Sequence, residues 1–306
     1  MTGAEGCIGA WVTKILLERG AEVLAFDVAE TRARLRLIAP DLDASRLRYE
    51  LGQLEDTARI KALVKDSGVT HIVHLAAVLM PFCQANPVQG ALINVVGTLN
   101  IFEAIRDAGR PIRISCASSS AVWGPEDAYD DRALNEHDTP LPSTQYGIYK
   151  LANEHSARVF HQQHGITSFA LRPWTVYGPG RDAGLTAAPT LALQHVARGA
   201  AYQLPVSGPM DLQFVEDVAG SFVACLESSL EGAHVFNLAG DIVDMWDFIR
   251  LVEEIHPAAL GLLKAEGPRV PVAHRMDASL LHATIPNLPR TTLAEGIRKT
   301  LALYGR

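Results

Sequence analysis

The sequence predicts an α/β fold, a doubly wound parallel sheet with a smaller C-terminal substrate-binding region. Short apolar segments typical of buried strands alternate with amphipathic helical segments along most of the chain. Three glycines open the first helix, and the strand after that helix ends in an acidic residue. We expect residues 1–172 and 211–240 to form the sheet domain, and residues 173–210 and 241–306 to form the substrate-binding region.

Length and composition exclude several classes of protein. The chain has 306 residues, of which 48% are hydrophobic and 20% charged, and its net charge is −7. This acidic balance argues against a nucleic-acid partner. Four scattered cysteines predict neither disulfides nor a metal site. We find no signal peptide and no apolar run that we expect to cross a membrane, so we expect a cytoplasmic protein.

The N-terminal glycines predict a dinucleotide site. Gly3, Gly6 and Gly9 would allow a tight turn and a close backbone approach to a pyrophosphate at the start of the helix that runs to residue 20. The strand 22–27 ends at Asp27, a carboxylate placed to accept hydrogen bonds from an adenosine ribose. Such a carboxylate repels a 2′-phosphate, which favours NAD over NADP.

Two alternatives to this interpretation stay open. Asp27 could be a solvated turn residue. Three arginines beyond it could also hold a 2′-phosphate; they are Arg32, Arg34 and Arg36. Only Met1 and Thr2 precede the first glycine, where a buried strand is expected. We therefore expect the first strand to be truncated and the natural protein to be several residues longer.

The alternation of helices and strands continues up to residue 108. We expect strands at 48–51 and 70–75 and helices at 57–67 and 87–108. The second strand runs into Ala76 and Ala77, whose small side chains would leave room for a cofactor. His74 is expected to be a strand histidine with satisfied partners. Asn94, a polar residue in an apolar helix, is expected to steady the active-site helix or a water.

A hydroxyl cluster and a Tyr-Lys pair predict the chemistry. The strand 112–117 leads into three serines at positions 118–120, at the sheet edge where ligands bind. A polar excursion, 127–142, delivers the chain to a helix at 146–164. Tyr146 and Lys150 share one face of that helix, where an ammonium would stabilise a phenolate and suit the tyrosine for acid-base catalysis. By itself, this spacing could also be a coincidence.

The last third of the chain predicts the substrate region. A strand at 168–173 is followed by a Gly- and Pro-rich loop, 174–189, which we expect to recognise substrate. A helix is expected at 190–198, a strand at 235–238, and late helices at 245–256 and 293–304. We interpret Asp217 as the N-cap of a helix that begins at Val218.

Taken together, these motifs resemble the extended short-chain dehydrogenase/reductases, the NAD-dependent epimerase/dehydratase group, over nearly the whole chain. The resemblance rests on the order and spacing of several motifs. They are Thr2-Gly3-x-x-Gly6-x-x-Gly9, Asp27, His74-Leu-Ala-Ala77, Asn94-Val-Val-Gly-Thr98, Ser118-Ser119-x-x-Val122-Trp123-Gly124, Tyr146-x-x-x-Lys150, Arg172-Pro173-x-x-Val176-Tyr177-Gly178-Pro179 and Val215-Glu-Asp-Val218. The fold that this resemblance implies is of the Rossmann type.

The resemblance implies a catalytic triad of Ser119, Tyr146 and Lys150. Tyr146 would take a proton from a substrate hydroxyl, Lys150 would bind the nicotinamide ribose, and Ser119 would hold the substrate oxygen. It also implies a homodimer through helices at about 94–106 and 146–164. The residues expected to bind NAD are Gly3, Gly6, Cys7, Ile8, Asp27, Leu54, Leu75, Ala76, Ala77, Tyr146, Lys150 and Pro173. Substrate contacts are expected from Ser119, Ser120, Thr175 and Thr186.

Departures from the family pattern narrow the chemistry. Dehydratases of the family carry an Asp-Glu pair where this chain has Ser120 and Ala121, so dehydration is disfavoured. Members that act on nucleotide sugars commonly have an asparagine at Thr175 and an arginine near Met210, and the loss of both weakens a diphosphate site. Three arginines remain candidates for binding a carboxylate or phosphate; they are Arg172, Arg181 and Arg269.

These expectations give one leading function and two alternatives. We expect an NAD-dependent oxidoreductase or epimerase that acts on a secondary alcohol of a sugar, sugar acid or similar small polyhydroxylated molecule. The first alternative is a nucleotide-sugar 4-epimerase. The second is a non-catalytic NAD-binding regulator, which the retained tyrosine and lysine disfavour.

Overall fold

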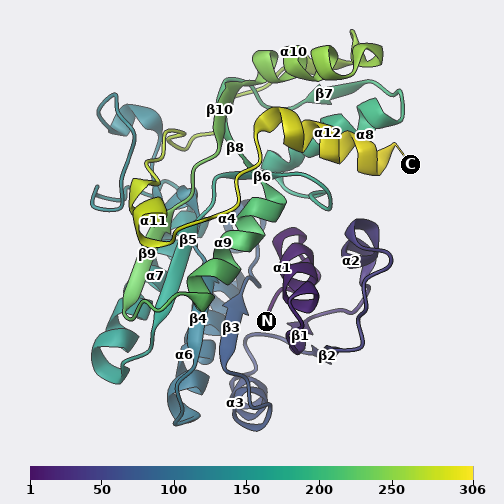
Figure 1. The fold of residues 1–306 in the computed structure, drawn as a ribbon. Coiled ribbons are helices and arrows are strands. Elements are labelled where there is room, and N and C mark those ends of the chain that lie inside the picture. Colours follow the sequence, from purple (N-terminus) through teal and green to yellow (C-terminus); the bar gives the residue numbers. More distant parts are fainter. Residues whose placement is uncertain (306) are drawn as a thin grey trace.

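A parallel sheet forms the centre of the computed structural model, which describes residues 1–305 (Figure 1). The strands are four or five residues long, and the residues of the central strands are mostly buried, which suits a sheet covered on both faces. The strands of this sheet are β1 (Val23–Asp27), β2 (Leu47–Leu51), β3 (His71–His74), β4 (Arg113–Ala117), β5 (Ser168–Arg172) and β9 (Ala233–Asn237).

The sheet has the order of a doubly wound fold. β1 pairs with β2, and β3, β4, β5 and β9 pair in that order, all in parallel. Thr2 joins the two groups through parallel bridges to Phe26 and His74. The buried amino group of Met1 also donates to the carbonyl of Leu24 at 2.5 Å. Met1 and Thr2 thus fill the place of the first strand, and the chain reverses direction across the sheet beside them.

Helices cover both faces of the sheet. On one face α1 (Cys7–Glu18) packs against α9 (Val215–Glu227) and α2 (Ala33–Ile38). On the other face α6 (Gly97–Asp107) packs between α3 (Thr57–Asp66) and α7 (Gln145–His164). Each layer has its own apolar core against the sheet. The predicted α/β architecture is therefore confirmed.

Local sequence signals fix the ends of the helix that carries the Tyr-Lys pair. Thr144 is the N-cap of α7, and its hydroxyl accepts the backbone N–H of Gly147 at 3.1 Å. The helix ends at Gly165, whose φ of 69° lies in the left-handed region that glycine adopts without strain. The first turn of α7, which holds Tyr146, is therefore anchored to the preceding loop.

A long helical run lies between β3 and β4. It consists of α4 (Met80–Ala85), α5 (Pro87–Ala91), a π-helical turn (Leu92–Val96) and α6. The stretch Pro87–Asp107 is long and apolar enough to span a bilayer by length and composition, contrary to our expectation. Half of its most apolar 18-residue window is buried inside the protein, where α6 packs against α3 and α7.

A smaller lobe follows the sheet and lies above it in Figure 1. Its apolar core packs α8 (Ala188–Ala197), α10 (Met245–Ile255) and α12 (Leu293–Tyr304) around β8 (Pro209–Phe214). The lobe contains a three-stranded sheet of β6 (Thr175–Tyr177), β8 (Pro209–Phe214) and β10 (Asp241–Asp244), and a pair of β7 (Tyr202–Leu204) with β11 (Leu263–Ala265). The helices of this part of the chain are α8 (Ala188–Ala197), α10 (Met245–Ile255), α11 (Ser279–Thr284) and α12 (Leu293–Tyr304).

One predicted cap is wrong. Helix α9 begins at Val215, so Asp217 lies in its first turn and is not its N-cap. The Asp217 carboxylate instead accepts hydrogen bonds from the backbone N–H of Thr291 at 2.5 Å and from its hydroxyl at 2.9 Å. Asp217 therefore ties the segment before α12 to the sheet domain.

Candidate active site

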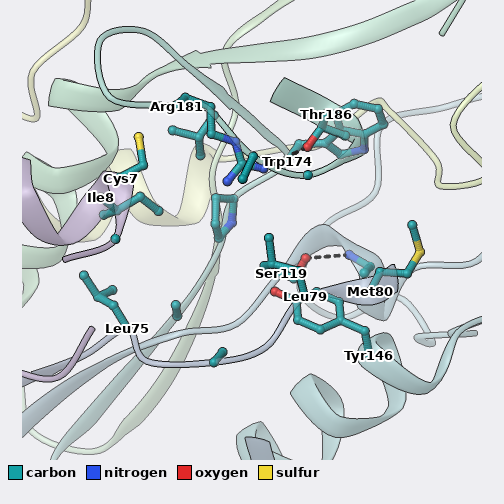
Figure 2. Close-up of a pocket in the computed structure, with 18 of the residues that line it drawn as sticks. Cys7, Ile8, Leu75, Leu79, Met80, Ser119, Tyr146, Trp174, Arg181 and Thr186 are labelled. Carbon is teal, nitrogen blue, oxygen red and sulfur yellow. Dashed lines mark hydrogen bonds between the residues drawn. The ribbon is translucent and has the colours of Figure 1, made fainter. Parts of the chain in front are cut away.

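A cavity of about 340 Å³ lies at the carboxyl end of the sheet, next to the point where the chain reverses direction. This is where open parallel sheets bind their ligands. The glycine loop, the ends of β3 and β4, the start of α7 and the loop after β6 all contribute to its wall (Figure 2). The predicted site residues that line it are Gly3, Gly6, Cys7, Ile8, Leu75, Ala77, Ser119, Ser120, Tyr146, Lys150, Pro173 and Thr186.

The glycine loop forms a cradle in which side chains would not fit. A Cβ atom on Gly3, whose φ is 72°, would lie 2.6 Å from the backbone nitrogen of Ala76. A Cβ atom on Gly9 would lie 2.0 Å from the carbonyl oxygen of Gly3. Helix α1 starts at this loop with no side-chain cap and no acidic residue in its first turn. Its free amide groups and dipole therefore suit a pyrophosphate.

Asp27 stands at the end of β1 and outside the wall of the cavity. Its carboxylate accepts the backbone N–H of Glu5 at 2.9 Å and that of Val28 at 2.7 Å. These bonds hold the carboxylate beside the glycine loop, where a ribose hydroxyl could reach its remaining lone pairs. The placement fits the ribose-binding role that we expect for Asp27.

The three arginines after Asp27 are all engaged elsewhere. Arg32 pairs with Glu30, and Arg36 donates to the carbonyl of Thr31. Arg34 donates to Asp182 at 2.6 Å and to the carbonyl of Gly180 at 3.0 Å. A 2′-phosphate would have to displace these partners, so the arrangement disfavours NADP.

The expected triad residues face the cavity together. Figure 2 shows Tyr146 reaching from α7 toward Ser119, at the end of β4. The Lys150 ammonium lies 5.4 Å from the centre of the Tyr146 ring and donates to the carbonyl of Ala117 at 2.6 Å. The Ser119 hydroxyl oxygen accepts the N–H of Ala121 at 3.1 Å, which leaves its own proton free to be donated.

Two polar residues of the sheet domain have structural partners, as we expect for His74, whereas the Asn94 side chain binds the segment after β3 and not the helix that carries Tyr146. Burial, with a smaller effect of the Lys150 charge, lowers the pKa of His74 to about 3, so its ring is neutral. The two ring nitrogens of His74 contact the hydroxyls of Thr2 at 2.7 Å and Thr98 at 2.9 Å. The Asn94 side chain holds both the N–H and the carbonyl of Val78 at 2.9 Å.

Several expected contacts do not reach the cavity. Thr175 is fully buried in β6, so the expected substrate contact is not available to it. Leu54 is buried against Gly97 and belongs to the core between α3 and α6, and Ala76 is outside the cavity wall. Among the candidate arginines, Arg269 is exposed and outside the wall, and Arg172 is buried in an ion pair with Glu154. Of these three arginines, Arg181 lines the cavity.

The structure also adds cavity residues that the sequence analysis did not identify. Leu79 and Met80 come from the turn into α4, and Val270 and Val272 come from a distant segment after β11. Trp174 also lines the cavity, and its indole N–H donates to the carbonyl of Ala273 at 2.8 Å. The part of the cavity beyond the triad therefore has several apolar walls.

Comparison with known proteins agrees with this geometry. The sequence model of the "NAD dependent epimerase/dehydratase family" matches residues 1–239. The chain belongs to this family. Its Gly3-to-Gly9 cradle, the start of α1 and Asp27 fit the NAD of the family, which is the cofactor of this protein.

Curated relatives match nearly the whole chain. UDP-glucuronate 4-epimerase 6 of Arabidopsis thaliana is 27% identical, over 99% of this chain and 70% of the relative. UDP-glucose 4-epimerase of Mycolicibacterium smegmatis is also 27% identical, over 99% of this chain and 97% of the relative.

Solved structures share the fold of this family member. UDP-glucose 4-epimerase of Thermotoga maritima, solved with UDP-glucose, has a TM-score of 0.84 at 22% identity and covers 99% of this chain and 97% of its own. MoeE5, solved with UDP-glucuronic acid and NAD, has a TM-score of 0.80 at 25% identity, with the same coverage. L-threonine dehydrogenase of Clostridium difficile has a TM-score of 0.84 at 18% identity and covers 99% of this chain and 96% of its own.

Proposed function

We propose that this protein is an NAD-dependent oxidoreductase or epimerase that acts on a secondary alcohol of a small polyhydroxylated carboxylate, such as a sugar acid. The observation that carries the proposal is the convergence of Ser119, Tyr146 and Lys150 on the same cavity as the glycine cradle. NAD, when bound, accepts a hydride from the alcohol carbon. The protein's part is to bind the substrate, orient it and accept its proton.

The proposed roles of the three residues follow from their contacts. The Tyr146 phenolic oxygen accepts the proton of the substrate hydroxyl. The Lys150 ammonium, fixed by the carbonyl of Ala117, stabilises the negative charge that the tyrosine oxygen carries as general base. Ser119 donates its free proton to the substrate oxygen and so holds it near Tyr146. Ser120 and Ala121 offer no carboxylate here, so elimination is disfavoured.

Arg181 supports a substrate that carries a negative charge. Within residues 1–305 its Nη2 donates to the Thr186 hydroxyl at 3.2 Å, and its buried Nε has no hydrogen-bond partner. Arg34, another cation of the cavity wall, is instead paired with Asp182 at 2.6 Å. A guanidinium with unused donors suits a carboxylate, which can accept two parallel hydrogen bonds. Arg181 and Thr186 are therefore the proposed carboxylate and hydroxyl contacts of the substrate.

The alternative is a nucleotide-sugar 4-epimerase, and the names of the relatives favour it. UDP-glucuronate 4-epimerases and a UDP-glucose 4-epimerase are among the similar proteins. Against it, Thr175 and Met210 are both fully buried and stand where we expect the diphosphate ligands of such enzymes. We therefore propose a free sugar acid as the first substrate to test and a UDP-sugar acid as the second.

The experiment compares the two substrate classes directly. Purified protein is mixed with NAD and with glucuronate, galacturonate or gluconate. The absorbance of NADH is followed, and the products are analysed by chromatography for epimers. UDP-glucuronate and UDP-glucose are treated in the same way in parallel. NADH or an epimer formed from a free sugar acid supports the proposal. Turnover of the UDP-sugars alone gives the alternative, and no turnover in either arm contradicts both.

Arg181 has its own test within this assay. Arg181→Met removes the charge and keeps the length, so we expect KM for the acidic substrate to rise at least about tenfold. Arg181→Lys keeps the charge but loses the paired donors and should recover part of the affinity. Arg269→Met, which changes an exposed arginine outside the cavity, is the control and should leave KM for the acidic substrate unchanged. An unchanged KM in Arg181→Met would show that Arg181 does not bind the carboxylate of the substrate.

We also propose a homodimer through α5, the π-helical turn and α7. Along the first two elements Val88, Leu92 and Val96 are exposed at 75%, 40% and 37%. On α7, which contacts the π-helical turn, Ile148 and Val159 are exposed at 46% and 39%. Such an apolar stripe is costly to leave in water and suits helix packing with a second copy.

Light scattering tests the homodimer. Val88→Asp combined with Ile148→Asp should give the mass of a monomer, whereas the unchanged protein has the mass of a dimer. Leu260→Asp, at a residue exposed at 77% beyond α10, is the matched control and should leave the dimer intact. A monomeric mass for the unchanged protein would contradict this proposal.

A further inference from the structure

A buried ion pair lies behind the cavity and takes no part in the proposed chemistry. Arg172, at the end of β5, donates from Nε and Nη2 to the two carboxylate oxygens of Glu154 on α7, at 2.8 and 2.7 Å. The side chains are only 3% and 4% exposed. The hydroxyl of Ser118 donates to the same Glu154 carboxylate at 2.5 Å. One carboxylate thus joins the ends of β4 and β5 to α7.

The partners of Glu154 lie next to the proposed catalytic groups along the chain. Ser118 directly precedes Ser119. Glu154 follows Lys150 by four residues and Tyr146 by eight, so it lies one turn and about two turns further along the same helix. The bond from Ser118 to Glu154 therefore links the segment that carries Ser119 to the helix that carries Tyr146 and Lys150.

Arg172 fixes the same segment from its other side. The guanidinium lies 4.7 Å from the ring centre of Trp123, which is fully buried five residues after Ser118. Its Nη1 lies 3.5 Å from the side-chain oxygen of Asn237 at the end of β9. Ser119 is therefore held between Ser118, bound to Glu154, and Trp123, stacked on Arg172.

Stability alone does not account for this arrangement. The desolvation of two charges offsets most of their attraction, and apolar pairs of similar volume often replace buried ion pairs without loss of stability. What a bidentate pair with a third donor provides is a fixed direction for each group. Proton transfer depends on such direction, because a misplacement of about 1 Å can reduce a rate about 100-fold.

We propose that Ser118 and Glu154 are positioning residues that set the distance and direction between Ser119 and Tyr146. Glu154 is outside the cavity wall, whereas Ser118 lines the cavity but donates its hydroxyl to Glu154. The bond from Lys150 to Ala117 anchors the lysine to β4. The Ser118–Glu154 bond is a second link between α7 and the end of β4, directly before Ser119. The inference rests on the proposed function, because it presupposes the roles of Ser119 and Tyr146.

The main variant is Ser118→Ala, which removes one hydroxyl and leaves the ion pair in place. It is assayed with NAD and the panel compound that the unchanged protein turns over fastest. We expect kcat to fall about tenfold, while KM and the dissociation constant of NADH change less than twofold. Ser115→Ala is the matched control, because Ser115 is a fully buried serine of β4 whose hydroxyl has no partner within residues 1–305. It should leave kcat within twofold.

Two further variants separate positioning from a general loss of structure. Ser118→Thr restores the hydroxyl and should recover most of kcat. In a Ser119→Ala background, Ser118→Ala should cause little further loss, because the group that it positions is already gone. Glu154→Gln should show the same loss of kcat at assay temperatures below its melting temperature, where the variant is folded.

The outcomes distinguish this inference from the function on which it rests. An unchanged kcat in Ser118→Ala, or a tenfold loss that persists in the Ser119→Ala background, would overturn the positioning role. If Tyr146→Phe abolishes turnover while Ser118→Ala does not reduce it, the inference alone is wrong. If no panel compound is turned over by the unchanged protein, the proposed function fails and this inference fails with it.

Discussion

Arg34 of α2 and Asp182 of the loop after β6 meet at the edge of the cavity, with Nη2 of the arginine 2.6 Å from Oδ1 of the aspartate. The same guanidinium donates to the carbonyl of Glu5 in the glycine loop at 2.5 Å and to that of Gly180 at 3.0 Å. One side chain thus joins the NAD-binding loop to the loop that we expect to recognise substrate. It can hold these two loops together beside the bound cofactor.

Asp182→Asn should weaken this link between the two loops. Both side chains are partly exposed, so the pair contributes about 1 kcal/mol or less, and we expect NADH to dissociate about two to five times faster. Stopped-flow fluorescence of NADH measures this rate. Glu227→Gln, which breaks an exposed ion pair with Arg19 away from the cavity, is the control. Equal rates in the unchanged protein and Asp182→Asn would show that the pair does not retain NADH.

Gly9→Ala should disturb the cradle directly. The added methyl group would meet the carbonyl oxygen of Gly3 at 2.0 Å, and backbone cannot move aside as a side chain can. We expect a loss of about 1–3 kcal/mol of stability and at least about tenfold weaker NADH binding, measured by fluorescence titration.

Gly109→Ala is the control for that experiment. Gly109 has a φ of 62°, and no atom of residues 1–305 lies within 4 Å of its added Cβ, so the variant costs about 1 kcal/mol of stability through backbone strain. Its affinity for NADH should not change. If both variants weakened NADH binding equally, the cradle would not be the cause.

Asp211 predicts a pH dependence of stability. Burial raises the pKa of this carboxylate to about 7, although the N–H groups of Gln213 and Gly240 that it accepts oppose the shift. The folded protein then keeps a proton that the unfolded chain loses above about pH 4, so the contribution to stability falls as pH rises from about 4 to 7, by up to about 4 kcal/mol. Asp211→Asn should flatten the pH dependence of urea unfolding over this range. An identical slope in both proteins would contradict the raised pKa.

Much of the fold could be predicted from the sequence because short apolar strands and amphipathic helices differ in period. The strands at 70–75 and 112–117 and the helix at 146–164 were predicted within two residues of β3, β4 and α7. The short elements of the smaller lobe were missed, since strands of three residues such as β6 and β7 are too brief for periodicity to show. The cap at Asp217 was wrong because an aspartate is also favourable within the first turn of a helix, where Asp217 lies.

Those site residues could be predicted whose position along the chain, at the end of a strand or the start of a helix, determines that they lie at the same edge of the sheet. Gly3 and Ser119 lie just after strand positions of the sheet, and Tyr146 lies at the start of a helix. A parallel sheet brings the carboxyl ends of its strands, and the starts of the helices that follow them, to one edge. Thr175 and Arg172 could not be judged in this way, because alternation along a strand decides whether a side chain faces the cavity or the core. The contribution of Val272, nearly a hundred residues beyond Trp174, depends on tertiary packing alone.

The measurement that tests the central claim most directly is the turnover of Tyr146→Phe. This variant removes only the phenolic oxygen, and the ring that lies 5.4 Å from the Lys150 ammonium remains. General acid-base catalysis typically contributes about 100- to 10,000-fold, so kcat should fall by at least about 100-fold while NADH binds within twofold of its normal affinity. A variant that turns over substrate within twofold of the unchanged protein would contradict the proposed mechanism.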